Sequence, residues 1–412
     1  MKYVQLLSIG LLALLVMSAV SGLLIKQIGG SSKYEPEEMD DRLSLSARAL
    51  LNEALEGIDP GTLVDHHAHV VGVGVGGTGA WVNEKLLTWR APIHRLKTSA
   101  YLSGARIKDM DDADHQYVQR LVRLARHFPR GIKVQLLAFD HHYRRDGSIN
   151  YEKSEFYVPN EYVFQLAETY PDIFVPAISV HPYRADALAE LDKWAAQGMR
   201  FVKWVPNAQG INASDPELQH YYERMIEHDM ILLTHVGEEQ AVEAEEDQAL
   251  GNPLLFRKPL DMGLKVVMAH CASLGMDEDL DNPGQFLSSF ELFIRLMDNP
   301  AYEDNLFGEL SAMTQFNRLP EPIIELMKRT DLHHRLINGS DYPLPAINVV
   351  IRTSDLQKYG MLTAAERQFL NEIYDYNPLL FDFVLKRTIR VPGTDIGFPS
   401  SVFGSHPELI SH

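Results

Sequence analysis

Two histidines separated by one residue, His67 and His69, are the pair in this sequence whose type and spacing most directly permit metal chemistry. They lie at the end of an apolar run that reads as a β-strand, and residues two apart in a strand point to the same face. Both imidazoles could therefore bind one cation. A single strand-end histidine, taken alone, could equally be a packed core residue.

Three further polar residues, His235, His270 and Asp341, end other apolar runs. If these runs are parallel strands that end at one edge, His67, His69, His235 and Asp341 form a set of three imidazoles and one carboxylate. That set suits one Zn²⁺, with Fe²⁺, Mn²⁺ or Co²⁺ as substitutes. An open position on such an ion would hold a water whose pKa falls toward ~7. Asp341 could instead form a turn hydrogen bond before Tyr-Pro.

The elements that must position these residues are eight short runs rich in Val, Ile and Leu, which alternate with segments of helical periodicity. The runs are continuously apolar, as is typical of parallel strands covered on both faces. Together they predict an α/β fold, a (β/α)₈ TIM barrel forming a single catalytic domain, with its site at the C-terminal ends of the strands. The predicted strands are 63–70, 132–139, 174–180, 199–205, 230–236, 264–270, 305–313 and 336–342.

The alternative fold is a doubly wound open sheet, which would need a glycine-rich phosphate turn after its first strand. Val71–Gly79 reads VGVGVGGTG, but no helix obviously opens after these glycines, so nucleotide binding there is disfavoured. Helices are expected over Asp186–Gly198, where the glycine suits a C-cap, and over Asp215–His228, where an aspartate precedes a proline. The acidic run Glu238–Asp247 is interpreted as a solvated loop or helix face, with a role in screening the site entrance as the lesser alternative.

Composition excludes several classes of protein. The chain has 412 residues with 38 Lys+Arg and 56 Asp+Glu, a formal charge of −18, which opposes nucleic-acid binding. Its one cysteine, Cys271, excludes an intramolecular disulfide scaffold and cysteine-rich zinc folds. Any metal must therefore be held by histidines and carboxylates.

The N-terminal segment Val4–Ile25 is uncharged and apolar, and about 20 helical residues span a bilayer. We expect residues 1–26 to be a membrane anchor, with a cleaved signal peptide as the alternative. Residues 27–45 read as a polar linker, 46–390 as the barrel and 391–412 as a C-terminal tail. The catalytic domain is then expected to be membrane-anchored or exported, on the extracytoplasmic side.

Several motifs carry a resemblance to a known family. VDHHAHV, around His67, fits a DxHxH opening, and NGSDYP, around Asp341, fits a GSDxP closing motif. The segments GMRFVKWVPNAQG, MILLTHVGE and VVMAHCASLG are similar to intervening strands of the same family. Over Thr62–Lys386 the chain resembles the amidohydrolase superfamily, in the amidohydrolase-2 branch of metal-dependent hydrolases related to aminocarboxymuconate semialdehyde decarboxylase.

The resemblance implies roles for these residues. His67, His69, His235 and Asp341 would hold the metal, Asp341 would also accept a proton, and His270 would orient or deprotonate the bound water or substrate. One metal is expected.

One lysine and one histidine near these ligands need separate consideration. Lys203 could be carboxylated in a binuclear centre, or could act as a cation for the substrate or as a structural strand residue. His66 replaces the family's usual aliphatic residue, and by strand alternation it should face the helix layer.

Further polar residues near strand ends are candidates for substrate contacts. Arg144, His181 and Arg184 follow the second and third strands, and the two arginines could pair with a carboxylate, although both could instead be solvated loop residues. Glu309 and Ser311, in the seventh strand, are expected to form hydrogen bonds to the ligands or the pocket.

The resulting functional hypothesis is a metal-dependent hydrolase that uses metal-activated water on a C–N or C–O bond of a small, anionic substrate. The alternative is a non-oxidative, metal-dependent decarboxylase on the same scaffold, with the same ligands. A third reading, a membrane-tethered scaffold protein that has lost catalysis, is disfavoured because every expected ligand is present. The expected partners are a small-molecule substrate and, through the N-terminal segment, a membrane.

Overall fold

The computed structural model describes residues 33–88, 92–242 and 244–409. Its eight principal strands are all parallel and form two sheets, of order β1-β3-β5 and β12-β11-β8-β7-β6. Each lies within one of the eight predicted runs. Their bounds are β1 Val64–His69, β3 Lys133–Leu137, β5 Phe174–Ala177, β6 Phe201–Trp204, β7 Ile231–His235, β8 Lys265–Ala269, β11 Leu306–Glu309 and β12 Leu336–Ile337.

The two sheets meet at two seams, each crossed by backbone hydrogen bonds. At one, Lys203 N donates to Ile178 O at 2.7 Å, between β6 and the end of β5. At the other, Asp341 N donates to His67 O at 2.7 Å, between the segment after β12 and β1. The described residues do not form one closed eight-stranded ladder, so the barrel prediction is confirmed in part. Irregular backbone after β12, where Asp341 has φ 59°, interrupts the ladder there.

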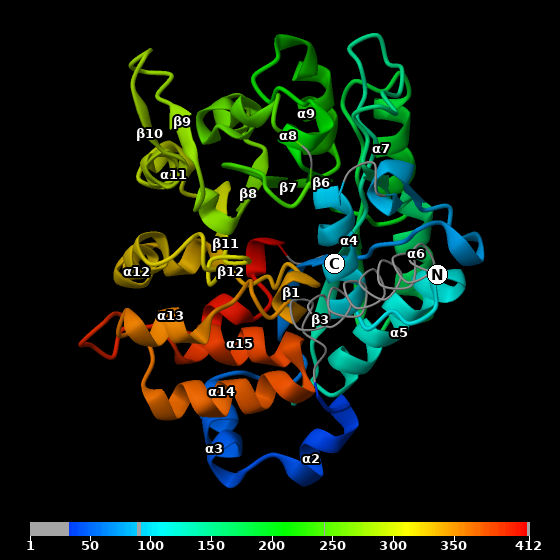
Figure 1. Ribbon diagram of the computed structural model, residues 1–412. Helices are drawn as coiled ribbons and strands as arrows, with labels where there is room; N and C mark the ends of the chain where they lie inside the picture. The colour runs from blue at the N-terminus through cyan, green and yellow to red at the C-terminus, as the bar shows by residue number, and fades with distance from the viewer. Residues whose placement is uncertain (1–32, 89–91, 243, 410–412) are drawn as a thin grey trace, which may run out of the picture.

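The larger helices surround the two sheets (Figure 1). The predicted helices at 186–198 and 215–228 are present as α7 and α9, and Gly198, φ 80°, follows α7 as expected. The α-helices are α2 Met39–Arg42, α3 Leu45–Ala54, α4 Pro92–Gly104, α5 Ala113–Arg126, α6 Asn160–Thr169, α7 Ala187–Ala195, α8 Pro206–Gln209, α9 Gln219–Glu227, α10 Arg257–Asp261, α11 Ser289–Met297, α12 Glu321–Lys328, α13 Thr353–Lys358, α14 Ala364–Tyr376 and α15 Pro378–Thr388.

Two antiparallel ribbons lie outside the main sheets. The first pairs β2 Trp81–Val82 with β4 Phe156–Tyr157, and the second pairs β9 Met276–Glu278 with β10 Phe286–Ser288. Between β1 and β2 the glycine-rich segment forms only a short 3₁₀ turn, η2 Val75–Gly77. A phosphate-binding helix start is therefore absent from that described segment, as the sequence indicated.

The core has two parts, because successive side chains of a strand face opposite ways. One face of the strands packs against the helices and forms the larger hydrophobic cluster. The other face forms a second, enclosed cluster, which we call the floor. The floor consists of Leu137, Ala177, Phe201, Ile231, Leu233, Val267, Ala269, Phe307, Ile337 and Leu409.

A β-bulge in β1 corrects the prediction for His66. Asp65 pairs with Val134 and Ala68 with Leu136, so His66 and His67 together oppose the single residue Gln135. His66 consequently does not face the helix layer. Its Nδ1 lies 3.1 Å from Gln135 Oε1 and its ring 6.0 Å from the ring of Phe201, a floor residue. The extra residue of the bulge thus turns His66 toward the floor while His67 faces the site.

The C-terminal segment packs against the start of the strands. Leu409 belongs to the floor, and Ser405 N donates to Thr62 O at 2.8 Å, just before β1. The predicted membrane segment Val4–Ile25 lies outside the described residues. Within the part of the chain that the structure describes, no helix has the length and apolar character needed to cross a membrane.

Candidate metal centre

Three of the four predicted ligands converge at the ends of β1 and β12. His69 Nε2 lies 3.1 Å from Asp341 Oδ1 and 3.3 Å from His67 Nε2, and His67 Nε2 lies 3.6 Å from Asp341 Oδ1. One ligand atom from each residue fits within a 4.8 Å span, which suits a shared metal ion. Two nitrogens and an oxygen, from three residues that the sequence pattern grouped, therefore lie close together.

His235, the fourth predicted ligand, is outside that compact group. It lines the cavity into which His67, His69 and Asp341 also face. Its Nδ1 lies 3.2 Å from Glu239 Oε2, and its Nε2 is buried without any hydrogen-bond partner. An unpartnered buried nitrogen is costly unless something binds it. The donor set and this open nitrogen both fit a divalent metal.

The hydrogen bonds around the histidines fix which nitrogen is free. His67 Nδ1 lies 3.0 Å from Glu309 Oε2, and His235 Nδ1 faces the Glu239 carboxylate. A carboxylate accepts, so in both rings Nδ1 carries the proton and Nε2 keeps a lone pair. Such carboxylate partners orient metal-binding imidazoles.

His270 lies beside these rings but has a different partner. Its Nδ1 lies 2.7 Å from Ser311 Oγ and 3.1 Å from Ser311 O, while Ser311 Oγ donates to Glu309 Oε2 at 2.6 Å. The carbonyl can only accept, so Nδ1–H donates and Nε2 is left as a proton acceptor. The ring lies 5.1 Å from both the His67 and His235 rings.

Burial favours the neutral form of His67, His235 and His270. It lowers the pKa of His235 to about 4 and lowers the pKa values of His67 and His270 well below the usual range. Neutral imidazole is the form that ligates metals and accepts protons. Burial would raise the pKa of Asp341, but the hydrogen bond from His69 and the nearby positive groups hold it below its usual value.

The backbone at the strand ends is locally strained. Asp341 and His270 have φ values of 59° and 58°, in the left-handed region that residues with a Cβ rarely adopt. Gly339 permits close packing there, because a Cβ at this position would overlap the Glu309 carboxylate and approach His67 Cβ. Asp65 joins β1 to this segment: its Oδ1 accepts from His67 N at 3.1 Å and from Ser340 N at 2.7 Å.

Lys203 lies at the base of the same cavity and is fully buried. Its Nζ lies 3.5 Å from His67 Nε2, and burial lowers its pKa to about 8. Lys203 thus lies beside His67, one of the candidate ligands.

The other predicted substrate contacts do not line the cavity. Arg184 pairs with Asp140 at 3.1 Å and with Asp186 at 2.8 Å, and Arg144 donates to Ile149 O at 3.0 Å. His181 is buried, with Nε2 2.8 Å from Gln209 O. The structure therefore gives these three residues local structural partners.

Two residues near the site were missed by the sequence interpretation. Glu239 belongs to the acidic run read as solvated, yet it is buried and contacts His235. Its position four residues after a strand-end histidine was the available signal. Arg318 is buried, donates to Ser273 Oγ at 3.1 Å, and its charge helps to lower the pKa of His270. No motif marked it.

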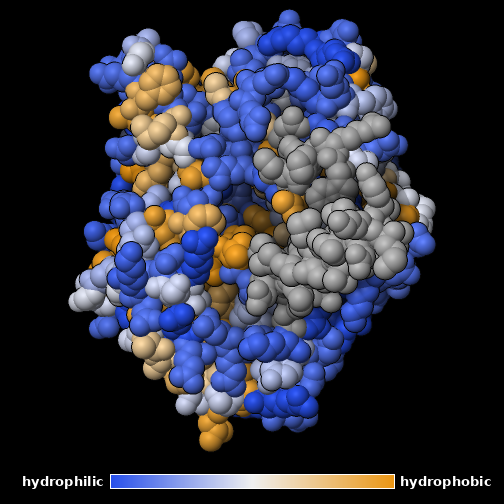
Figure 2. All heavy atoms as spheres, in the orientation of Figure 1, coloured by the Kyte–Doolittle hydropathy of each residue, from blue (hydrophilic) through white to orange (hydrophobic). Residues whose placement is uncertain are grey.

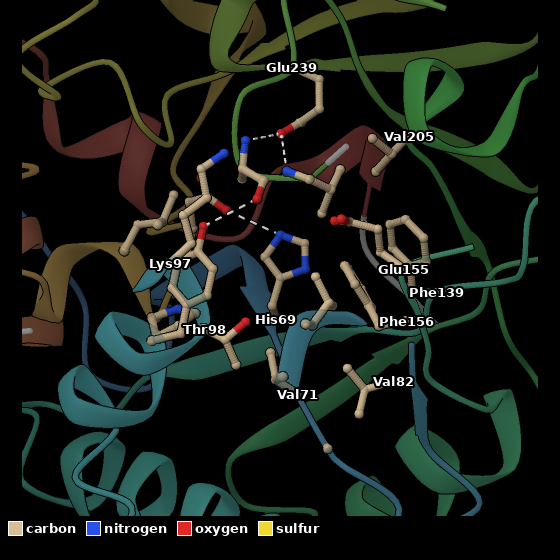
Figure 3. Close-up of a pocket in the computed structure, with 18 of the residues that line it drawn as sticks. His69, Val71, Val82, Lys97, Thr98, Phe139, Glu155, Phe156, Val205 and Glu239 are labelled. Atoms are coloured by element: carbon tan, nitrogen blue, oxygen red, sulfur yellow. Dashed lines mark hydrogen bonds and ion pairs between the residues drawn. The ribbon is translucent and has the colours of Figure 1, made fainter. Parts of the chain in front are cut away.

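A cavity of about 150 Å³ opens above these residues. Hydrophobic side chains gather around the hollow in the middle of the face shown in Figure 2. Figure 3 shows Val71, Val82, Phe139, Phe156 and Val205 around the His69 ring. These apolar residues come from the ends of strands and from the β2 and β4 ribbon.

The mouth of the cavity is bridged by hydrogen bonds between α4 and the loop after β7. Lys97 Nζ donates to Gln240 O at 2.7 Å, and Tyr101 OH donates to Ala241 O at 3.5 Å. Glu239 holds the same loop, because it accepts from Val242 N at 3.1 Å. The residue that orients His235 thus also shapes the entrance.

Comparison with known proteins identifies the family of the chain. The amidohydrolase family model matches residues 64–347, and the chain belongs to that family. The resemblance inferred from the sequence is thereby confirmed. No curated protein matches the chain significantly.

Solved structures are similar at low identity. An uncharacterized TIM-barrel protein from Bordetella bronchiseptica is 16% identical, TM-score 0.45, covering 76% of this chain and 99% of that one. A probable 2-pyrone-4,6-dicarboxylic acid hydrolase from Acinetobacter baumannii is 16% identical, TM-score 0.42, with coverages of 77% and 96%. A 5-carboxyvanillate decarboxylase from Novosphingobium aromaticivorans, with bound manganese, is 11% identical, TM-score 0.42, with coverages of 78% and 95%.

Proposed function

We propose that the chain is a metal-dependent hydrolase that cleaves a C–N or C–O bond. The observation that carries this proposal is the convergence of His67, His69 and Asp341 beneath an open cavity, with the unpartnered Nε2 of His235 facing the same space. His67, His69, His235 and Asp341 would hold one divalent ion. Zn²⁺ suits these nitrogen and oxygen ligands, and Fe²⁺, Mn²⁺ or Co²⁺ could replace it.

When bound, the metal would supply Lewis acidity at the reacting bond. The protein's own residues would supply proton transfer. His270 Nε2 has a free lone pair, because Nδ1 is held by Ser311, so it accepts the proton of the attacking water. Asp341 is the other acceptor at this position, and its lowered pKa keeps it ionised at neutral pH.

Hydrolysis is favoured over decarboxylation by the cavity's surroundings. A decarboxylase needs a cationic group for the substrate carboxylate, and the sequence offered Arg144 and Arg184 for that purpose. Both are bonded elsewhere, and no arginine is among the described residues that line the cavity. Among the described residues that line the cavity, the cations are Lys203 at its base and Lys97 at its mouth.

The proposal is tested by incubating metal-loaded protein with aryl and alkyl esters, lactones, amides, and aromatic or unsaturated carboxylic acids. We expect cleavage of an ester, lactone or amide, detected as release of an acid, and no release of CO₂. A chelator-treated sample and a His270→Asn variant serve as controls. CO₂ release from a carboxylic acid, without hydrolysis of any neutral compound, would establish the decarboxylase instead.

A further inference from the structure

The walls of the cavity differ sharply from its base. At the base lie histidines, Lys203 and Asp341, whereas the walls are formed largely by aliphatic and aromatic side chains. In Figure 3 several of them lie around the labelled His69, although they come from segments far apart in the sequence. The apolar lining residues include Val71, Val82, Leu86, Phe139, Phe156 and Val205. A substrate body that fills this space exchanges water for hydrocarbon contact.

The charged side chains of the wall are few, and each has contacts with the protein. One N–H of the Lys97 ammonium donates to the carbonyl of Gln240 at 2.7 Å, at the mouth of the cavity. Glu239 is engaged by His235, and Glu155 is a further buried carboxylate that lines the cavity. The Glu239 carboxylate would repel an anionic substituent that lies against it, and the apolar wall would leave such a substituent without hydrogen-bond partners.

The size of the space also constrains the substrate. The cavity is about 150 Å³. An apolar cavity of about that volume accommodates a benzene ring. A ring or a branched chain of similar bulk would therefore fill it while the bond to be cleaved lies against the base.

From this we infer that the substrate has an uncharged, apolar body about the size of one aromatic ring, attached directly to the reacting group, and carries no second charge. The inference rests on the proposed function, because it takes the histidine cluster as the place where the bond reacts. It departs from the expectation of a small anionic substrate, because Arg144 and Arg184 are bonded to other residues, while Lys203 lies at the base, where the bond reacts.

Binding of metal-chelating probes tests this without turnover. We would measure the affinities of acetohydroxamic, benzohydroxamic and 4-carboxybenzohydroxamic acids for the Zn²⁺-loaded protein by calorimetry. The three share one chelating group and differ in their bodies. Burial of a phenyl group predicts benzohydroxamate binding about 10- to 100-fold more tightly than acetohydroxamate. The added carboxylate should weaken binding by at least about 10-fold, because it must be desolvated against a largely apolar wall.

A matched pair of variants locates the effect. Phe156→Ala removes a wall ring that lies 4.2 Å from the Phe139 ring, and it should weaken benzohydroxamate about 10-fold while changing acetohydroxamate less than about twofold. Phe286→Ala removes an exposed ring on β10, outside the cavity lining, and should change neither. If Phe156→Ala fails to fold, the comparison of the three probes on the unmodified protein still decides.

Equal binding of the methyl and phenyl probes, tighter binding of the carboxylated probe, or no binding by any of them would overturn the inference. Hydrolysis of small polar esters alongside such a result would leave the proposed function intact. Conversely, the protein could bind the probes in the expected order and yet hydrolyse nothing on the panel. That result would support the inference about the cavity and contradict the proposed hydrolase activity.

Discussion

The two ends of the strands that enclose the interior bury opposite kinds of side chain. In β6 and β11 the first part of the strand contributes to the floor, through Phe201 and Phe307. Two residues further along these strands lie Lys203 and Glu309, both beside His67. The same strands therefore carry the apolar floor and, next to it, a cluster of buried polar side chains.

This difference shows how the molecule supports its reactive end. Buried nitrogens and oxygens cost free energy unless they have partners, and burying hydrocarbon returns about 25 cal/mol per Å². At the site, Glu309, Ser311 and Glu239 satisfy the Nδ1 atoms, but His235 Nε2 remains open. The floor supplies stability that the site does not. Substitutions at the metal site should therefore lower activity, whereas substitutions in the floor should lower stability.

The largest effect is expected from removing a ligand at the reactive end. His67→Ala should lower the metal content to less than about a tenth of an equivalent and the activity by ~10³-fold or more, since it removes one of the converging nitrogens. Metal analysis of the purified variant measures the first change. The unmodified protein should carry about one equivalent; about two, with a carboxylated Lys203, would show a binuclear centre instead.

A smaller loss is expected when the proposed proton acceptor is replaced. His270→Asn should spare most of the metal and lower kcat by ~10²- to 10⁴-fold, because general-base contributions have that size. Metal content and kcat are measured on the same sample. If this variant loses its metal as fully as His67→Ala does, His270 is a ligand and the assigned division of roles is wrong.

Truncating a side chain in the floor should lower the stability of the protein without lowering its metal content. Phe201→Ala should lower the free energy of unfolding by about 3–5 kcal/mol, the usual cost of truncating a buried aromatic side chain. Chemical denaturation measures it, and metal stoichiometry below the transition should stay unchanged. Met276→Ala, on the exposed β9 ribbon, is the control and should change stability by less than about 0.5 kcal/mol.

The smallest predicted effect concerns the histidine that faces the floor. Burial lowers the pKa of His66 to about 4, against an unfolded value near 6.5, so between these pH values the unfolded chain binds more protons. Stability due to neutral His66 is therefore present above about pH 6.5 and is lost as the pH falls toward 4. At pH 5 the loss is about 1–2 kcal/mol relative to pH 7.5.

A His66→Gln variant tests this assignment. The difference in stability between pH 7.5 and pH 5, measured by denaturation at both values, should be smaller in the variant than in the unmodified protein. Identical pH dependence in the two proteins would show that His66 is not the group responsible.

Much of the fold and of the reactive end could be read from the sequence. Continuous apolar runs located all eight parallel strands, because strands covered on both faces need hydrocarbon on both. His67 and His69 were placed together because strand alternation is local geometry. Asp341 required only that its strand be parallel to β1.

The rest depended on contacts between distant segments. The bulge that turns His66 inward is an irregularity of pairing between β1 and β3, which no pattern within β1 reveals. Arg184 looked available because its partner Asp140 lies 44 residues away. Glu239 looked solvated because it lies in an acidic run, whereas its carboxylate is held by His235 and by amides of its own loop.

The hydrogen bond from Asp341 N to His67 O also has a consequence in time. Residues 67 and 341 are 274 positions apart, since 341 − 67 = 274. At roughly 5–20 residues per second, a ribosome that has made the first histidine needs on the order of tens of seconds to make the aspartate. During that interval His67 and His69 wait without their carboxylate. The reactive end is therefore assembled late in synthesis, and Leu409, which seals the floor beneath it, is made later still.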